Sequence, residues 1–515
     1  MAYFYSILFY LGCGGAVLCM GAASSDRFRV LRKPLSATLM TLITLLWAFA
    51  PQSGRWVLSV WAPTSVTGGL LVLDQHPAIW WSVLAMGTAA CGVLWADLSK
   101  REPALPLTGT LVLALFTVTW LGLTAGSLLM TLAVWTVFDI VWLVTRLVSS
   151  ADGDRVIWAA AVTGLASLLL WTVSLFLFQE GVSGLWWLMR PSKPIFALLL
   201  VGSLMRIGFY PFQVVVAESA GRSRALALVG LLGPVMGIAL LYRLVSLPGV
   251  VVLPTWVVAW GTLSTLWAGL RTLGLDGKDA LVPAGQALLL GAVTGALALA
   301  DADALVVSAG VWVIGMGLLS VAGRVDDRSI YLAWPAAVAV SFLLAPLSPL
   351  GRLYLRLFSP ISWGWRITLM LGFALGSAAL LRSAVVRVKG RLLPPDVRTG
   401  LGWIGGLLVM LGVLIWSGFR ADGPVVEPVS TLLWAGSLAI AALLVYARRL
   451  TASIGQQLRP LLELLDLQWF YQAAWEGAEN LLGAVRATAE VVEGSGSVLW
   501  SVLVLLLVVM VIGSR

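Results

Sequence analysis

Arg206 lies inside an apolar stretch of the chain, shortly before Pro211. A guanidinium at membrane depth costs several kcal/mol unless an acidic partner or a hydrated cavity meets it, so we expect this residue to have a function. Proline lacks a backbone N–H and clashes with the preceding turn, so the helix should break near Tyr210-Pro211. Transporters build ion sites from broken helices that hold charges near the bilayer midplane. The pattern therefore predicts an ion site at Arg206.

The composition is that of a membrane protein with many spans. Of 515 residues, 60% are hydrophobic and 11% are charged, and the mean hydropathy is +0.96. A helix needs roughly 20 apolar residues to cross the hydrocarbon core. We expect an all-α polytopic membrane protein with about 16 transmembrane helices, with broken helices near Pro211 and Pro346 and an amphipathic lateral helix before the last span.

The positions of the 33 basic residues predict the orientation of the chain. With the first span running inward, most arginines and lysines fall in loops on the inner side, as the positive-inside rule requires. After an even number of spans, both termini lie on the outer side. We expect a multi-pass protein of the cell inner (plasma) membrane. The net charge of +9 reflects this bias, and we expect no nucleic-acid partner.

The sequence contains few residues that could bind a metal ion or a redox cofactor. The three cysteines are scattered, which fits neither a disulfide framework nor a thiolate metal site. His76 is the one histidine, which excludes sites with several histidine ligands. No nucleotide, flavin, quinone or iron–sulfur signature is visible, so we expect no cofactor, no bound metal and no catalytic residue. We interpret His76, Asp301 and Asp303 as ordinary loop charges on the outer surface.

Two segments lack the pattern of a plain span. Between Arg55 and Asp74, two short apolar runs joined by Pro, Thr, Ser and Gly predict an outer β-hairpin. Between Arg448 and Glu493 the chain is apolar on one helical face only, which is typical of a helix lying along the inner membrane surface or a neighbouring protein. The apolar face holds Leu458, Leu461, Leu462, Leu465 and Trp469.

The order of these features resembles the antiporter-like subunits of complex I, whose fold also occurs in Mrp-type sodium/proton antiporters and membrane-bound hydrogenases. The first half carries the hairpin, Leu73-Asp74, Val134-Trp135, and Gly208-x-x-Pro211-Phe212 after a charged residue. The second half carries Asp276-Gly277-Lys278-Asp279-Ala280-Leu281 with Gln286 and Gly291, and a weaker match at Pro346 with Gly351. Trp469-Phe470-Tyr471 and the segment Glu493 to Trp500 are similar to the lateral-helix extension of the longest such subunits.

The resemblance implies an organisation for the whole chain. It places N-terminal spans with the outer hairpin in residues 1–103, a first antiporter-like half in 104–250 and a second in 251–400. Additional spans follow in 401–448, the amphipathic lateral segment in 449–495 and the last span in 496–515. It implies lipid and other membrane subunits of a complex-I-like or Mrp-like assembly as partners, and it leaves any redox chemistry to those subunits.

The residues of the ion pathway depart from the pattern that the resemblance implies. In the family, a glutamate after tryptophan pairs with a lysine on the first broken helix, and a proton arriving at such a pair shifts the pKa of the neighbouring group. Here Thr136 takes the place of the glutamate, Arg206 that of the lysine, and Gln213 that of a histidine. Arginine keeps its proton at physiological pH, whereas a desolvated lysine can release one.

Other charged residues could complete the pathway. Asp139 is the first choice as the partner of Arg206, because it lies one turn beyond Thr136 and residues i and i+3 share a helix face. Glu218 is the second choice. Lys278 is either a channel lysine or a solvated charge, and Arg356 could stand in for the titratable residue of the second broken helix. The predicted ion pathway comprises Arg206, Asp139, Glu218, Thr136, Lys278 and Arg356.

Three functions stay open on these grounds. The chain could be an antiporter-like subunit of a complex-I-type or Mrp-type assembly that contributes to proton (or sodium) translocation along a degenerate pathway. It could be a non-conducting scaffold paralogue, in which Arg206 and its partner form a fixed clamp, because buried ion pairs are tolerated once satisfied. It could also be an unrelated polytopic flippase or carrier.

The predicted orientation can be tested by labelling single cysteines with a membrane-impermeant thiol reagent. A cysteine at Arg387 or Arg448 should stay unlabelled in intact cells, because both positions fall on the inner side. A cysteine at Asp301, in an outer turn, should be labelled. Labelling of either inner position without permeabilisation would contradict this topology.

Overall fold

A computed structural model gives the arrangement of the chain. It describes residues 2–24, 31–60, 70–98, 107–149, 153–216, 228, 230–248, 254–275, 280–322, 361–384 and 428–465, together with residues 467, 469–473, 476–477, 479–480 and 483. The structural statements below concern these residues. The chain forms two compact units, Met1–Gln457 and Leu458–Arg515, and each is described by itself.

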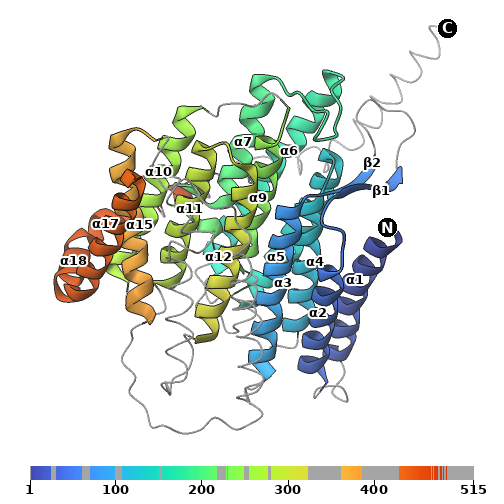
Figure 1. The fold of residues 1–515 in the computed structure, drawn as a ribbon, viewed down its shortest axis with the longest axis horizontal. Coiled ribbons are helices and arrows are strands. Elements are labelled where there is room, and N and C mark those ends of the chain that lie inside the picture. The colour runs from blue at the N-terminus through green and yellow to red at the C-terminus, as the bar shows by residue number, and fades with distance from the viewer. Residues whose placement is uncertain are drawn as a thin grey trace. The chain divides into compact units, whose positions relative to one another are not determined.

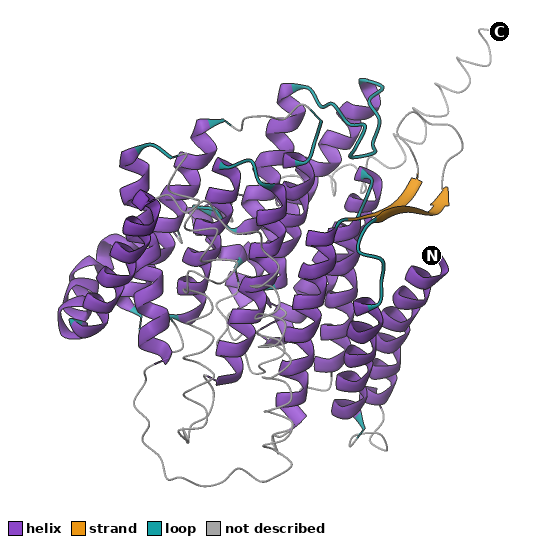
Figure 2. Cartoon of the chain, viewed as in Figure 1, coloured by secondary structure: helices purple, strands orange, loops and turns teal. Residues whose placement is uncertain are grey.

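Helices make up almost all of the described chain (Figure 2). Six described helices are long and apolar enough to cross a membrane, and five more apolar helices are shorter. The prediction of an all-α polytopic membrane protein is confirmed, whereas the total of about 16 spans stays a prediction. The α-helices are α1 (Ala2–Ser24), α2 (Arg32–Ala48), α3 (Pro77–Leu98), α4 (Thr108–Thr124), α5 (Leu128–Ser149), α6 (Gly153–Gln179), α7 (Lys193–Ile207), α9 (Leu232–Val245), α10 (Thr255–Arg271), α11 (Leu281–Ala298), α12 (Ala302–Ala322), α15 (Trp363–Ala384), α17 (Pro428–Tyr446) and α18 (Arg448–Leu465).

The predicted hairpin is confirmed, and it lies at one end of the helices (Figure 1). Strands β1 (Gly54–Val60) and β2 (Leu70–Gln75) pair antiparallel, with Arg55 opposite Asp74. β2 also forms a bridge to Ala125, between α4 and α5. The buried side chain of Gln75 accepts a hydrogen bond from the Tyr5 hydroxyl at 2.8 Å, which ties the hairpin to α1. The hairpin is therefore part of the bundle and not a free loop.

Helix α3 brings the N-terminal helices against the later part of the chain. Its Trp80 exchanges indole-to-carbonyl hydrogen bonds with Trp47 of α2, at 2.9 and 3.1 Å. The Ser82 hydroxyl of α3 donates to the Val306 carbonyl of α12 at 2.8 Å. Gly310 of α12 lies so close that a Cβ atom there would come within 2.9 Å of a tryptophan in α3. This packing sets the start of α3, which follows the hairpin, beside the start of α12.

The predicted break in the helix after Arg206 is also confirmed. Helix α7 ends at Ile207, and Gly208 adopts the left-handed conformation with φ of 87°. Its N–H and that of Phe209 donate to carbonyls of the last turn, which is the usual way to terminate a helix at glycine. A short 3-10 helix, η2 (Phe212–Val215), follows. The second break, predicted near Pro346, falls outside the described residues.

The start of the amphipathic segment is helical, as predicted. Helix α18 spans Arg448–Leu465, and it ends before Leu467, whose φ is positive at 56°. Leucines of its apolar face are exposed, with Leu461 at 51% and Leu465 at 37%. A row of bare leucines on one face is typical of a helix that covers a membrane or a partner surface. Its position on the inner surface stays a prediction.

The conformation at the break yields a stability prediction. Replacing Gly208 by alanine should destabilise the fold by about 1–2 kcal/mol, because a Cβ atom disfavours the left-handed region. That Cβ would also meet Val216 at 2.7 Å. Gly164→Ala in α6 is the control, since a Cβ atom there meets nothing within 4 Å. Denaturation in detergent, followed by tryptophan fluorescence, should show a lower midpoint for G208A alone; equal midpoints would argue against a strained break.

Candidate functional site

Arg206 and Asp139 form a buried ion pair where α5, α6 and α7 meet. Nη2 of Arg206 donates to Oδ1 of Asp139. The other carboxylate oxygen accepts a hydrogen bond from the Ser167 hydroxyl of α6 at 2.6 Å. The side chain of Arg206 is fully buried, whereas that of Asp139 is 20% exposed. The structure therefore brings together the two residues predicted to pair, and it adds a serine that no sequence signal had singled out.

Aromatic rings cover the guanidinium. Its Cζ lies 4.3 Å from the ring centroid of Trp135 and 5.1 Å from that of Phe138. Cation–π contacts of this kind stabilise a charge that water does not reach. Nε and Nη1 of Arg206 make no hydrogen bond to the described residues. Buried donors without an acceptor are costly, so Asp139 is the group on which the placement of this charge depends within the described part of the chain.

The broken backbone beside Arg206 is held by α10 and α11. The Gly208 carbonyl accepts a hydrogen bond from Nε2 of Gln286 at 2.9 Å. The Tyr210 N–H donates to the Ser264 hydroxyl at 3.0 Å, and its carbonyl accepts from the Trp260 indole. Backbone groups freed by a break at membrane depth need such protein partners. The backbone groups of Gly208 and Tyr210 thus have protein partners.

Among the other predicted pathway residues, Thr136 is the one that the structure describes, and it does not contact this pair. The Thr136 hydroxyl donates to the Leu132 carbonyl of its own helix at 2.9 Å, and the side chain is exposed. Asp139 and the aromatic residues Trp135 and Phe138 contact Arg206 instead. Glu218, Lys278 and Arg356 lie outside the described residues.

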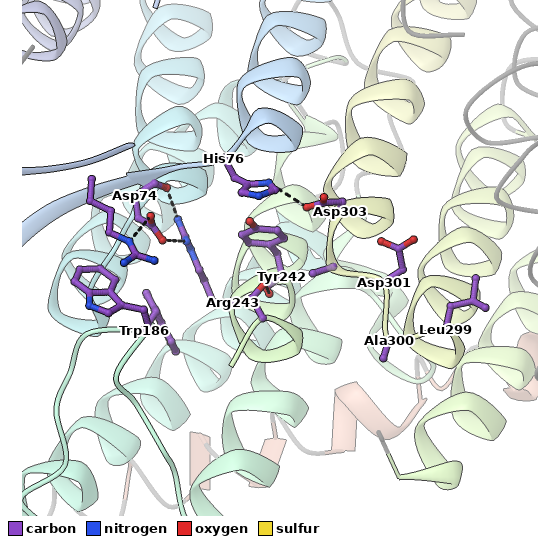
Figure 3. A pocket seen from close by; sticks show the side chains of 13 residues that line it. Asp74, His76, Trp186, Tyr242, Arg243, Leu299, Ala300, Asp301 and Asp303 are labelled. Atoms are coloured by element: carbon purple, nitrogen blue, oxygen red, sulfur yellow. Dashed lines mark hydrogen bonds and ion pairs between the residues drawn. The ribbon is translucent and has the colours of Figure 1, made fainter. Parts of the chain in front are cut away.

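A second charged group of residues lies at the hairpin end, around a pocket (Figure 3). Arg243 of α9, only 5% exposed, contacts Oδ2 of Asp74 through Nη1 at 2.7 Å. Its Nη2 donates to the carbonyls of Asp74 and Leu123, at 2.8 and 3.1 Å. Arg55 contacts the other oxygen of Asp74 at 3.1 Å. This aspartate therefore forms ion pairs with two arginines at once.

The opposite wall of the pocket shows a contact that the sequence did not predict. Nδ1 of His76 lies 3.2 Å from Oδ1 of Asp303, and Asp301 lines the same pocket. His76 and Asp303 are both exposed, and they lie close enough to form an ion pair when the imidazole is protonated. They meet because α3 packs on α12, which brings the end of β2 to the turn before α12. Because His76 and Asp303 are far apart in the sequence, their contact could not be predicted without the packing of α3 on α12.

The burial of Arg206 leads to a further prediction. Asp139→Asn should destabilise the protein by about 3–5 kcal/mol, because it leaves a buried charge without its counter-ion. Replacing both Asp139 and Arg206 by leucine should recover much of this loss, because no charge is then buried. Glu180→Gln, at an exposed carboxylate that accepts from Ser192, is the control. The free energies of unfolding of these variants can be measured by denaturation in detergent. Equal stability of D139N and E180Q would count against the ion pair.

Solved structures share this fold. A chain in the Mrp complex from Dietzia sp. DQ12-45-1b matches with a TM-score of 0.71 at 15% identity, over 99% of this chain and 63% of that chain. A chain of the membrane-bound sulfane sulfur reductase, an archaeal respiratory membrane complex, matches with a TM-score of 0.68 at 13% identity, over 98% and 99%. Respiratory complex I from Thermus thermophilus contains a chain that matches with a TM-score of 0.64 at 15% identity, over 85% and 99%.

Comparison with models of protein families gives no match, and neither does comparison with curated proteins. The chain spans less than two thirds of the Mrp-complex chain that it resembles. At 13–15% identity, the likeness establishes the fold. The chain therefore has the fold shared by chains of these three complexes, as the resemblance to antiporter-like subunits predicted.

Proposed function

We propose that this chain is an antiporter-like subunit of a multisubunit membrane assembly of the complex-I or Mrp type, where it contributes to proton (or sodium) translocation. The fold supports the assembly, since the matched structures are an Mrp complex, a respiratory membrane complex and respiratory complex I. The observation that carries the proposal is the buried Arg206–Asp139 pair beside the break in α7. A charge at a broken helix is how membrane proteins build ion sites.

Within the pair, Asp139 is the group that exchanges protons. Arginine stays charged at physiological pH, so Arg206 acts as a fixed electrostatic gate. A proton that binds Asp139 leaves Arg206 without its counter-ion, which raises the free energy of the site and favours onward transfer. The Ser167 hydroxyl, which donates to this carboxylate, can accept from it once the carboxylate is protonated. Aspartate and serine thus supply the proton acceptor and its relay.

The exposed side chains suit a position among lipid and other subunits. Ile140 of α5 is 61% exposed, and Leu168 and Leu175 of α6 are 63% and 65% exposed. This apolar face supports contacts with lipid or with a neighbouring membrane subunit. We place the chain in the inner (plasma) membrane with both termini outside, on the basis of the positive-inside bias. Glu218, Lys278 and Arg356 belong to the proposed pathway as candidates from the sequence.

One alternative has an observation in its favour. A scaffold without conduction fits the arginine at position 206, because this residue cannot release a proton, and it fits Thr136, which bonds its own helix. In that case the Arg206–Asp139 pair is a structural clamp. A carrier of unrelated fold finds no support in the structural comparisons.

Proton transport in vesicles distinguishes the subunit from the scaffold. When the assembly is reconstituted, Asp139→Asn should slow translocation by about 10²–10⁴-fold, the contribution of a positioned proton-transfer group. Glu180→Gln should pump like wild type. Subunit composition of both variants must match wild type, so that lost pumping is not lost assembly. An intact D139N assembly that pumps at the wild-type rate would make this chain a scaffold.

A further inference from the structure

The pocket at the hairpin end is large enough to hold water. Its volume is about 620 Å³, and a water molecule occupies about 30 Å³ in the liquid. The walls come from distant parts of the chain: the hairpin, the start of α3, the end of α9 and the turn between α11 and α12 (Figure 3). Nε of the buried Arg243 finds no acceptor among the described residues.

Charged side chains line this pocket on both sides. Two arginines and three aspartates line it, so one net negative charge is left while His76 is neutral. A proton on the imidazole cancels that charge. Asp74 pairs with both arginines, so the wall that holds Asp301 and Asp303 is the acidic side. The charged or titratable groups that line the pocket are Arg55, Asp74, His76, Tyr242, Arg243, Asp301 and Asp303.

His76 is placed to exchange protons with the surrounding water. Its side chain is 51% exposed, and its Nδ1 lies 3.2 Å from Oδ1 of Asp303. Imidazole is the side chain that ordinarily changes charge between about pH 5 and 8. With Nδ1–H donating to Asp303, Nε2 is the atom that binds and releases a proton. Asp303 then stabilises the imidazolium.

Helix α9 connects the level of the buried pair with this pocket. A Cβ atom at Gly237 would come within 2.7 Å of the Ser203 carbonyl of α7, so the two helices touch at the turn that holds Arg206. Arg243 lies six residues further along α9, a rise of about 9 Å at 1.5 Å per residue. Helix α9 therefore runs from the turn of α7 that holds Arg206 to the wall of the pocket.

We propose that this pocket is where protons pass between the pathway and the medium on the hairpin side, with His76 and Asp303 as the exchanging pair. The inference rests on the proposed function. A proton from pocket water binds Nε2 of the neutral imidazole, and the imidazolium releases it from Nε2 to the medium. Only the proton moves, and no redox partner is needed.

Vesicles that contain the assembled complex test this inference. His76→Gln keeps a side-chain donor for Asp303 but cannot take up a proton, so it should slow translocation at neutral pH by at least about tenfold. Free imidazole in the medium on the hairpin side should restore much of the rate, because it replaces the lost acceptor. Glu180→Gln should change neither the rate nor the response to imidazole.

The outcomes separate this inference from the function on which it rests. A wild-type rate in H76Q, with pumping lost in D139N, would overturn the exchange site and leave the proposed function standing. A wild-type rate in D139N would overturn both. If H76Q slows translocation and free imidazole does not restore the rate, His76 has a structural role and the proposed exchange site is overturned. If H76Q fails to assemble, Asp303→Asn, which keeps an acceptor for Nδ1–H, should slow translocation several-fold; an unchanged rate would overturn the proposal.

Discussion

The burial of one guanidinium constrains the centre of this fold. Arg206 is fully buried, and such a charge without a counter-ion costs about 3–5 kcal/mol. Asp139 supplies the counter-ion from α5, and Ser167 of α6 fixes the orientation of the carboxylate. The ring of Trp135 covers a face of the charge. Because this charge requires a counter-ion, α5 and α6 pack beside the end of α7 at the position of Arg206.

The backbone that follows α7 must also be satisfied, and it contacts α10 and α11. Because the chain leaves the helix at Gly208, backbone groups at membrane depth need partners that lipid cannot provide. Gln286 of α11 and Ser264 of α10 provide them. The broken helix is thus bonded on one side to the ion pair and on the other to α10 and α11. Under the proposed function, a change of charge at Asp139 would act through Arg206 on a helix end that α10 and α11 also hold.

The sequence predicted those parts of the site whose signals are local. A charge ahead of a proline marked the break, and helical spacing pointed to Asp139. Gln286 stood in a recognised stretch, yet its bond to Gly208 depends on how α11 meets α7, which spacing does not encode. The pocket was missed because His76 and Asp303 are far apart in the chain and meet only through the packing of α3 on α12. Local patterns thus reveal charges and breaks, whereas cavities arise from contacts between distant helices.

Infrared difference spectroscopy of the assembly during turnover tests most directly whether Asp139 carries a proton. A carboxylate that takes up a proton gains the carbonyl stretch of a carboxylic acid, and a permanently ionised clamp does not. We expect such a band in the wild-type assembly, and its absence in Asp139→Asn while the Glu180→Gln spectrum is unchanged. An identical band in wild type and D139N, or no band in wild type during active pumping, would contradict this expectation.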